Sequence, residues 1–220
     1  MTADTRQLIL DTALRLFEER GYAGTTMRAI AAEAGVSPSN AYYWFASKDQ
    51  LVQEFYRRIQ VAHRDRSAGV LAGAGTLSER LMGVERAGLE VMAPYHGFGA
   101  AFVGTAIVPG ATVSPFSEES AGARELSMEI YRDVVAGASP AVPARLAQVL
   151  PDLLWLAHLS VILYWVIDTS PDQERTGRLV ERSVAMLASA VRLSRLPGAA
   201  GLISQVGSVL DVVVPERSRP

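Results

Sequence analysis

The chain has no cysteine and a single lysine, Lys48, among its 220 residues. The lack of cysteine excludes disulfide bonds, thiolate zinc sites and a cysteine nucleophile. The longest apolar run, 153–167, is interrupted by His158 and Ser160 and is shorter than the ~20 residues that a membrane-spanning helix needs. The first twenty residues mix acids and bases with apolar residues, unlike a secretory signal. We therefore expect a cytoplasmic protein without membrane contact.

The composition is that of a folded globular chain. Apolar residues make up 49% of the sequence and charged residues 20%, which allows a sizeable core. The length allows one large domain or two modest ones. The net charge of −2 gives no global sign of nucleic-acid binding, and residues 1–50 contain five bases against six acids. DNA binding by this segment would therefore depend on where its bases stand and not on their number.

The spacing of apolar residues predicts an all-α fold. Almost every segment shows helical spacing, and no alternation is long enough to predict a strand. The boundaries separate a three-helix domain, residues 1–47, from a larger helical domain, residues 48–215. The predicted helices cover residues 4–20, 27–34, 38–45, 48–70, 76–93, 95–108, 117–136, 144–169, 172–196 and 199–214.

The segment 25–51 has the features of a helix-turn-helix. A short helix is followed by a tight turn at 35–37 and by a second short helix with polar and aromatic residues. In this motif the first helix braces the second, which lies in the major groove of DNA. The residues spaced to pack inward and fix the two helices are Ile30, Ala31, Val36, Ala41 and Phe45.

The opposite face of the second short helix carries groups that suit DNA. The Tyr42 hydroxyl and the Lys48 ammonium are suited to backbone phosphates. The two-pronged guanidinium of Arg28 is suited to a guanine. If no DNA were bound, this face would be a solvated, aromatic-rich junction. The candidate DNA-binding residues are Thr26, Arg28, Ser37, Ser39, Asn40, Tyr42, Tyr43, Trp44 and Lys48.

These residues resemble the TetR family of bacterial regulators. The family's N-terminal pattern appears here in order as Gly21-Tyr22, Thr25-Thr26, Ile30-Ala31, Ala34-Gly35-Val36-Ser37, Tyr42 with Phe45, and Lys48 with Leu51. The resemblance is close over residues 6–55, and beyond residue 60 only the general helical architecture agrees. Ala41 departs from the pattern, since the family commonly has Leu or Val at this position.

The resemblance implies a homodimeric transcriptional repressor. Such a protein has a ligand cavity in its C-terminal domain, and ligand binding moves the two DNA-reading heads apart and releases the operator. We therefore expect a repressor released from a palindromic operator by a small apolar or aromatic ligand. A transcriptional activator, or a regulator that needs no ligand, with the same DNA-binding head is the alternative.

The C-terminal half contains candidates for ligand contact and for dimerisation. Mixed aromatic, methionine and isolated polar residues suit an apolar ligand, although the same residues can simply fill a core. The ligand candidates are Met92, Tyr95, His96, Phe98, Phe102, Phe116, Met128, Tyr131 and Trp155. A symmetric dimer would bury apolar surface of the helices at 144–169 and 172–196. The dimer candidates are Leu153, Val161, Trp165, Leu179, Met186, Leu187 and Ala190.

The sequence shows no catalytic pattern. His63, His96 and His158 stand far apart without metal-ligand spacing, and nucleophile-elbow, phosphate-loop and paired-histidine motifs are missing. We expect no enzyme activity, no metal and no cofactor. The expected partners are a double-stranded DNA operator, a second copy of the chain and a small-molecule effector. A purely structural helical adaptor is a further alternative, and it would protect no DNA fragment.

Overall fold

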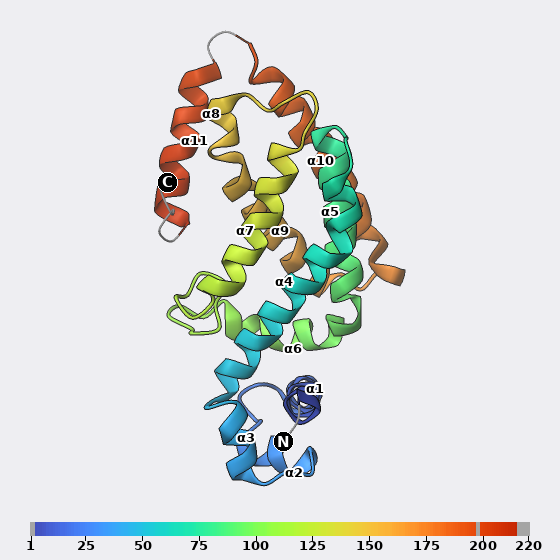
Figure 1. Ribbon diagram of the computed structural model, residues 1–220, viewed down its shortest axis with the longest axis vertical. Helices are drawn as coiled ribbons and strands as arrows, with labels where there is room; N and C mark the ends of the chain where they lie inside the picture. Colours follow the sequence, from blue (N-terminus) through green and yellow to red (C-terminus); the bar gives the residue numbers. More distant parts are fainter. Residues whose placement is uncertain (1–2, 197–198, 215–220) are drawn as a thin grey trace. The chain divides into compact units, whose positions relative to one another are not determined.

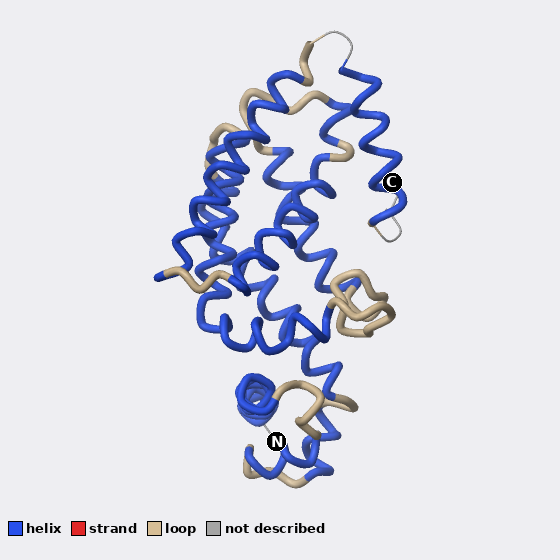
Figure 2. Tube along the Cα trace, turned by 180° about the vertical axis from the view of Figure 1, so that it is seen from behind, coloured by secondary structure: helices blue, strands red, loops and turns tan. Residues whose placement is uncertain are grey.

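The computed structural model describes residues 3–196 and 199–214, and these fold mainly into helices (Figure 1). Within these residues no strand forms, and the β pairing consists of one isolated bridge between Gly75 and Ala138 (Figure 2). The all-α prediction is therefore confirmed. The helices are α1 (Ala3–Arg20), α2 (Met27–Glu33), α3 (Pro38–Trp44), α4 (Lys48–Ala72), α5 (Leu77–Met92), η1 (Ala93–Tyr95), α6 (His96–Ala106), α7 (Ala121–Ala136), α8 (Ala144–Ala147), α9 (Leu150–Ile167), η2 (Pro171–Gln173), α10 (Glu174–Leu193) and α11 (Ala199–Val213).

The first helices begin and end at residues with the expected local chemistry. Gly21 (φ 74°) follows α1 and Gly35 (φ 67°) comes after α2, both in the left-handed backbone region that favours glycine. Thr26 Oγ1 accepts a hydrogen bond from the Ala29 amide at 3.2 Å. Ser37 Oγ accepts one from the amide of the third residue of α3, also at 3.2 Å. These caps satisfy amides that have no partner inside α2 and α3.

Two predicted helices differ from the structure. The helix expected from 117 begins only at Ala121, because the Ser117 hydroxyl accepts from the Ser120 amide at 3.2 Å and holds a separate turn. The helix expected over 144–169 is divided into α8 and α9. Pro151 has no amide hydrogen and fits only in the first turn of a helix, so the second helix starts at Leu150.

The chain divides into two compact units. The first consists of the residues up to Gln60 together with Met92–Arg124, and the second of Val61–Val91 together with the residues from Glu125 onward. This division differs from the predicted boundary at residue 48. In the first unit the rings of Phe17 in α1 and Phe98 in α6 lie 6.2 Å apart, and Tyr22 packs edge-on against Phe102 at 5.4 Å. These aromatic contacts join α6 to the N-terminal helices.

The second unit has an apolar core formed by α5, α7, α9, α10 and α11. Its fully buried large side chains include Ile130, Tyr131, Leu150, Leu154 and Trp165. Among the residues that the structure describes, α9 is the one helix long and apolar enough to cross a membrane, and 50% of it is buried inside the structure. That burial is typical of a core helix, which is how the sequence analysis interpreted the segment.

Arg80 joins the ends of α4 and α7 in the second unit. Its side chain is buried, and its guanidinium donates hydrogen bonds to backbone carbonyls. Carbonyl groups in the last turn of a helix have no amide partner within that helix, so a buried donor satisfies them. The acceptors are the carbonyl oxygens of Val70, Leu71, Gly73, Asp133 and Val134.

Candidate nucleic-acid interface

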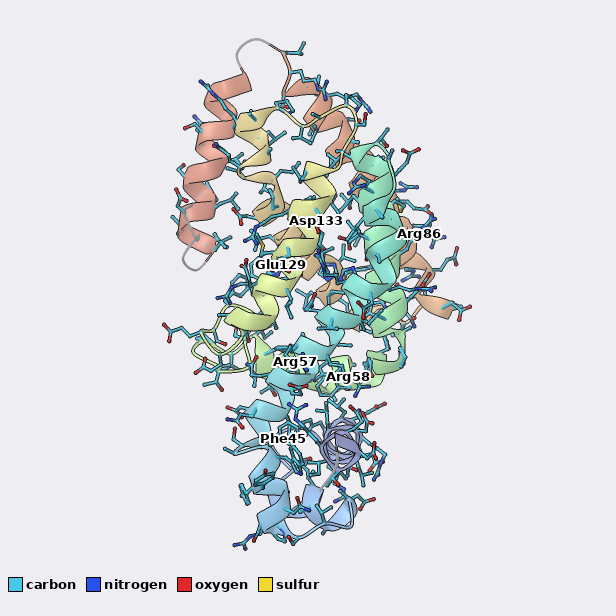
Figure 3. The ribbon with its side chains drawn as sticks, in the orientation of Figure 1. Phe45, Arg57, Arg58, Arg86, Glu129 and Asp133 are labelled. Carbon is cyan, nitrogen blue, oxygen red and sulfur yellow. The ribbon has the colours of Figure 1, made fainter. Side chains whose placement is uncertain are left out.

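The helices α2 and α3, which we call the reading head, are fixed against each other by small and apolar side chains. Ile30, Ala31 and Ala41 are fully buried, and Phe45 is 2% exposed at the end of α3 (Figure 3). Val36 in the turn is half-buried. Four of the five residues expected to point inward are therefore buried and the fifth is partly buried. This packing fixes the angle at which α3 is presented.

The outer face of α3 carries two exposed tyrosines. Tyr42 is 49% exposed and Tyr43 is 70% exposed, and Ser39 is exposed beside them. The Tyr43 ring stands edge-on to the Trp44 ring with the centroids 5.2 Å apart. Hydroxyl groups and aromatic faces are groups that contact phosphates and base edges in a DNA groove.

Asn40 and Trp44 are half-buried and are presented only in part. The Asn40 Oδ1 atom and the Trp44 Nε1 atom are buried, and neither has a hydrogen-bond partner among the described residues. The indole N–H of Trp44 therefore faces protein in this arrangement.

Lys48 makes contacts inside the protein that the sequence did not predict. Its Nζ donates to the carbonyl oxygens of Tyr22 at 2.7 Å and Thr25 at 3.2 Å. The same nitrogen lies 4.2 Å from the centroid of the Tyr22 ring. An ammonium group has three protons, so one remains for a phosphate after these two hydrogen bonds. Lys48 therefore holds the segment after α1 in place, in addition to its candidate role at DNA.

The other candidates lie around the starts of α2 and α3. Arg28 is exposed and forms no ion pair within the part of the chain that the structure describes. Thr26 and Ser37 are exposed, and both hydroxyls accept from backbone amides. A hydroxyl that accepts still has its own proton to donate, so these caps keep a donor for a phosphate oxygen. The nine candidates thus belong to the reading head, its flanking turns and the first residue of α4.

Several acids of the N-terminal segment are neutralised by arginine. Arg15 pairs with Glu19 at 2.9 Å and with Glu33 at 2.6 Å, and Arg58 pairs with Asp11 at 2.9 Å (Figure 3). Arg58 lies outside residues 1–50, so its pair with Asp11 offsets the one excess acid of that segment. Solvent-exposed pairs of this kind contribute little to stability.

Glu54 ties α4 to α1 through a stronger contact. Arg6 Nη1 donates to Glu54 Oε1 at 2.8 Å, and Arg57 donates to the same carboxylate at 2.7 Å. The hydrogen bond from Arg6, aided by Arg57, lowers the pKa of the Glu54 carboxyl to about 2. The Arg6 guanidinium also lies over the Phe45 ring, 5.0 Å from its centroid. Arg6 therefore links α1, α4 and the end of α3.

Two ligand candidates of the first unit lie in its core, and the others are partly or fully exposed. Phe98 and Phe102 are buried and stack with centroids 5.1 Å apart. The Tyr95 hydroxyl accepts from Arg58 at 2.7 Å. Met92 and His96 are half-buried and Phe116 is 40% exposed. A shallow hollow of about 190 Å³ in this unit includes two of the candidates and is lined by Asp11, Leu14, Arg15, Glu18, Pro94, Tyr95 and Phe98.

The ligand candidates of the second unit lie near a buried polar cluster. Met128, Tyr131 and Trp155 belong to the apolar core. The Tyr131 hydroxyl donates to Glu85 Oε1 at 2.9 Å, and His158 Nδ1 lies 2.9 Å from Glu85 Oε2. No sequence motif predicts a role for Glu85, although it is an acid in the predicted helix over 76–93 whose neighbours are mainly apolar.

His63 completes this cluster and corrects the expectation that the histidines are far apart. Its ring stacks on that of His158 with centroids 5.7 Å apart, and its Nε2–H donates to the Val84 carbonyl at 2.9 Å. Gly88 makes room for both rings, because a Cβ there would lie 3.1 Å from His63 and 3.4 Å from His158. Even so, the described residues contain no group of three His, Asp or Glu side chains placed to hold a metal ion.

The cluster keeps a charged carboxylate inside an apolar core. Burial, together with the neighbouring His158, lowers the pKa of His63 to about 4, so this imidazole is neutral near pH 7. Burial alone would raise the pKa of Glu85, but attraction to His158 and hydrogen bonds from His158 and Tyr131 lower it. Burial raises the pKa of Tyr131 well above its ordinary value, so its hydroxyl remains a donor.

The dimer candidates differ in their exposure. Val161 and Trp165 pack in the core of their own chain and leave little surface for a partner. Met186 is 70% exposed and Ala190 is exposed, whereas Leu153, Leu179 and Leu187 are half-buried. Periodicity alone could not separate the two faces of α9, because this helix is apolar all round.

Other exposed apolar side chains extend the outer face of α9 and α10. Leu163 and Ile167 lie four residues apart on α9, and Leu193 lies seven residues after Met186 on α10. These spacings put each pair on one face of its helix. We call Met186, Ala190 and Leu193 of α10 the apolar stripe.

Two models of known protein families match the chain. A model described as "Bacterial regulatory proteins, tetR family" matches residues 9–55, and one described as "Tetracyclin repressor-like, C-terminal domain" matches residues 80–211. The chain belongs to the TetR family. The resemblance seen in the sequence is therefore confirmed, and it extends into the C-terminal half.

Individual TetR-family relatives match in part. The regulator BetI of Rhizobium meliloti is 36% identical over 81 residues, covering 37% of this chain and 40% of that protein. The repressor KstR2 of Mycobacterium tuberculosis is 33% identical over 88 residues, covering 40% of this chain and 44% of that protein. The chain thus spans about two fifths of the length of these curated relatives.

Solved TetR-family structures share the fold over most of the chain. A regulator from Nitrosomonas europaea has a TM-score of 0.63 at 20% identity and covers 82% of this chain and 96% of its own. FadR from Bacillus subtilis, in complex with stearoyl-CoA, has a TM-score of 0.66 at 15% identity and covers 81% and 96%. At these identities the likeness concerns the fold.

Proposed function

We propose that this TetR-family chain is a sequence-specific DNA-binding transcriptional regulator, a repressor that acts in the cytoplasm on a palindromic operator. The observation that carries the proposal is the outer face of α3, where Tyr42 and Tyr43 are exposed on a short helix fixed from behind by α2. The family model over residues 9–55 and the name of KstR2, a transcriptional repressor, support it.

We propose that a small apolar or aromatic effector binds in the second unit. The Glu85–His158 pair supports this, because a few polar groups within apolar surroundings are typical of sites that orient apolar ligands. The candidate ligand contacts near this pair are Met128, Tyr131 and Trp155, which belong to the apolar core of the same unit. Of these, Tyr131 donates a hydrogen bond to Glu85. The complex of FadR from Bacillus subtilis with stearoyl-CoA is a precedent for a ligand in this fold.

We also propose that the chain acts as a homodimer joined through the apolar stripe. Two symmetric copies would each present one reading head, so the operator would be a palindrome whose half-sites are related by the same twofold axis. Exposed Met186 and Leu193 support this face, because large apolar side chains gain most from being covered by a partner.

The test is selection from random DNA with the purified full chain, followed by footprinting on the genome fragment that contains the enriched motif. We expect a palindromic motif, and a footprint over the promoter core that candidate effectors remove. A footprint upstream of the promoter would indicate an activator instead. Failure to enrich any motif would contradict the proposal. Tyr43→Ala, run in parallel, should enrich an altered motif if α3 reads the bases.

A further inference from the structure

One face of α4 holds the loop between α6 and α7, residues 107–120, by hydrogen bonds. Asp49, Gln53 and Tyr56 share this face because they are four and three residues apart. Gln53 Nε2 donates to the Thr112 carbonyl at 2.8 Å, and the Tyr56 hydroxyl donates to the Val113 carbonyl at 2.9 Å. The Thr112 hydroxyl donates to Asp49 Oδ2. We call residues 107–120 the α6–α7 loop.

The α6–α7 loop is firmly built around these contacts. Val113 is 2% exposed, and Ser120 is equally buried with its hydroxyl donating to the Ser114 carbonyl at 2.7 Å. Arg124 donates to the carbonyl oxygens of Pro115 at 2.8 Å and of Ser117 at 3.0 Å. The loop is therefore a braced segment, and a shift of its backbone would move the side chains on α4 that hold it.

Asp49 also contacts the segment beside the reading head. Its Oδ1 accepts a hydrogen bond from the Tyr22 hydroxyl, and burial together with this contact raises the pKa of Tyr22, so that the hydroxyl stays a donor. Tyr22 is further held by Lys48, which donates to its carbonyl at 2.7 Å. The α3 helix ends at Trp44, only three residues before α4 begins. One oxygen of the Asp49 carboxylate thus contacts the α6–α7 loop, and the other contacts Tyr22, which lies between α1 and the reading head.

The two hydrogen bonds that Asp49 accepts are more than the start of α4 requires. An acid in the first turn of α4 is favourable because of the helix dipole alone. That effect needs neither a tyrosine 27 residues earlier nor a threonine 63 residues later in the chain. Both hydroxyls instead use the carboxylate as a shared acceptor, and hydrogen bonds to a charged group are among the stronger ones in proteins.

We propose that Asp49 is a positioning residue for DNA binding, which sets the orientation of α3 by coupling the α6–α7 loop through Thr112 to Tyr22. Asp49 is not one of the candidate DNA-binding residues. The inference rests on the proposed DNA-binding function. Regulation follows from it, because any event that displaces Thr112 removes one of the two donors that hold Asp49.

The test compares Thr112→Val, which removes the hydroxyl at nearly constant shape, with Thr112→Ser, which restores it. Operator affinity is measured by fluorescence anisotropy at several salt concentrations, and the melting temperature is measured in parallel. We expect binding about tenfold weaker for Thr112→Val. Thr112→Ser should stay within about twofold of the parent, and the salt slope should be unchanged in both because no phosphate contact is lost.

Three results would overturn the proposal. Thr112→Val could bind like the parent, its salt slope could fall by about one phosphate contact, or its weaker binding could be matched by an equal loss of folded protein. Tyr22→Phe provides a second check through the same carboxylate. The double variant Tyr22→Phe with Thr112→Val should lose clearly less affinity than the product of the two single losses, whereas independent effects would multiply.

A measurement without DNA tests the positioning role of Asp49 separately from the proposed DNA-binding function. Acrylamide quenching of Trp44 reports on the reading head, because Trp155 and Trp165 are each 2% exposed and contribute little to quenching. Thr112→Val should raise Trp44 quenching, and Thr112→Ser should not. If the parent enriches no DNA motif but quenching responds, the proposed function fails and the positioning role stands. If the parent binds DNA and quenching does not respond, the positioning role fails.

Discussion

The buried imidazole of His63 makes the stability of the second unit depend on pH. Its folded pKa of about 4 lies below the ordinary value of 6.5, so the unfolded chain binds a proton in that window and the folded chain does not. Stability is therefore lost as pH falls from 6.5 towards 4, by at most about 3 kcal/mol from this group. Glu85, whose pKa is lowered, adds a further loss at more acidic pH.

Urea unfolding at pH 7.5 and at pH 5.0 measures this effect. The parent should be less stable at pH 5.0, and His63→Gln should reduce the difference between the two pH values. The groups that act on His63 are His158, Glu85 and the Val84 carbonyl, and all are retained in that variant. His96→Gln, in the other unit, is the control. An undiminished pH difference in His63→Gln would rule out His63 as its source.

A substitution of Lys48 separates its structural role from its candidate role in DNA binding. Lys48→Met keeps the apolar stem beside the Tyr22 ring but removes the donor to the Tyr22 and Thr25 carbonyls. We expect weaker binding to all DNA sequences alike, together with a lower melting temperature. The slope of log affinity against log salt should fall by about one if Lys48 also neutralises a phosphate. Weaker binding at an unchanged slope would reject that contact.

At the residue scale, local periodicity predicts which side of α3 faces inward but not what Lys48 and Glu85 contact. The faces of α3 follow from helical spacing within seven residues. Lys48 meets a carbonyl 26 residues earlier, and His158 meets a carboxylate 73 residues away. Such contacts depend on how the helices pack, which one sequence without tertiary information does not reveal.

At the element scale, Arg80 is the side chain that holds α4 and α7 together at their C-terminal ends. Arg80→Leu would leave five buried or partly buried carbonyl acceptors without this donor. We expect the free energy of unfolding to fall by about 3 kcal/mol, as for other losses of a buried hydrogen-bond network. Chemical denaturation monitored by circular dichroism measures it.

Arg86→Leu is the matched control on the same helix. The Arg86 side chain is exposed and pairs with Glu181 at 3.3 Å (Figure 3). Loss of an exposed pair should change the free energy of unfolding by less than about 1 kcal/mol. Equal effects of the two substitutions would show that the carbonyl contacts of Arg80 do not stabilise the unit.

Helix boundaries show the limits of prediction at this scale. Thr76 caps α5, with the Glu79 amide donating to its hydroxyl at 3.2 Å and the Glu79 carboxylate accepting from its amide at 2.8 Å. The prediction of one helix over 144–169 did not take Pro151 into account, although a proline inside a helix usually breaks it. The later start of α7 depends on the local Ser117–Ser120 turn and also on Gln53 of α4, whose contact with Ser120 the sequence does not reveal.

At the scale of the whole molecule, the proposed apolar stripe would join two chains, so that the dimer presents two reading heads. Met186→Glu places a charge in this stripe, twice in a symmetric dimer. Covering a methionine of this size contributes about 1.5–3 kcal/mol, and a buried unpaired carboxylate costs more than this gain. We expect sedimentation analysis to show a dimer for the parent and a monomer for Met186→Glu at the same concentration.

The operator then separates dimerisation from DNA reading. A Met186→Glu monomer should bind a single half-site like one head of the parent, because Met186 lies on α10 and the reading head is unchanged. On the full palindrome it should bind with lower affinity than the parent dimer. In the dimer the two reading heads are linked, and this linkage raises the affinity without any new contact. Ile107→Glu is the control, since Ile107 is 67% exposed and lies outside the stripe. If Met186→Glu remains dimeric, or if Ile107→Glu dissociates equally, the dimer forms through another surface.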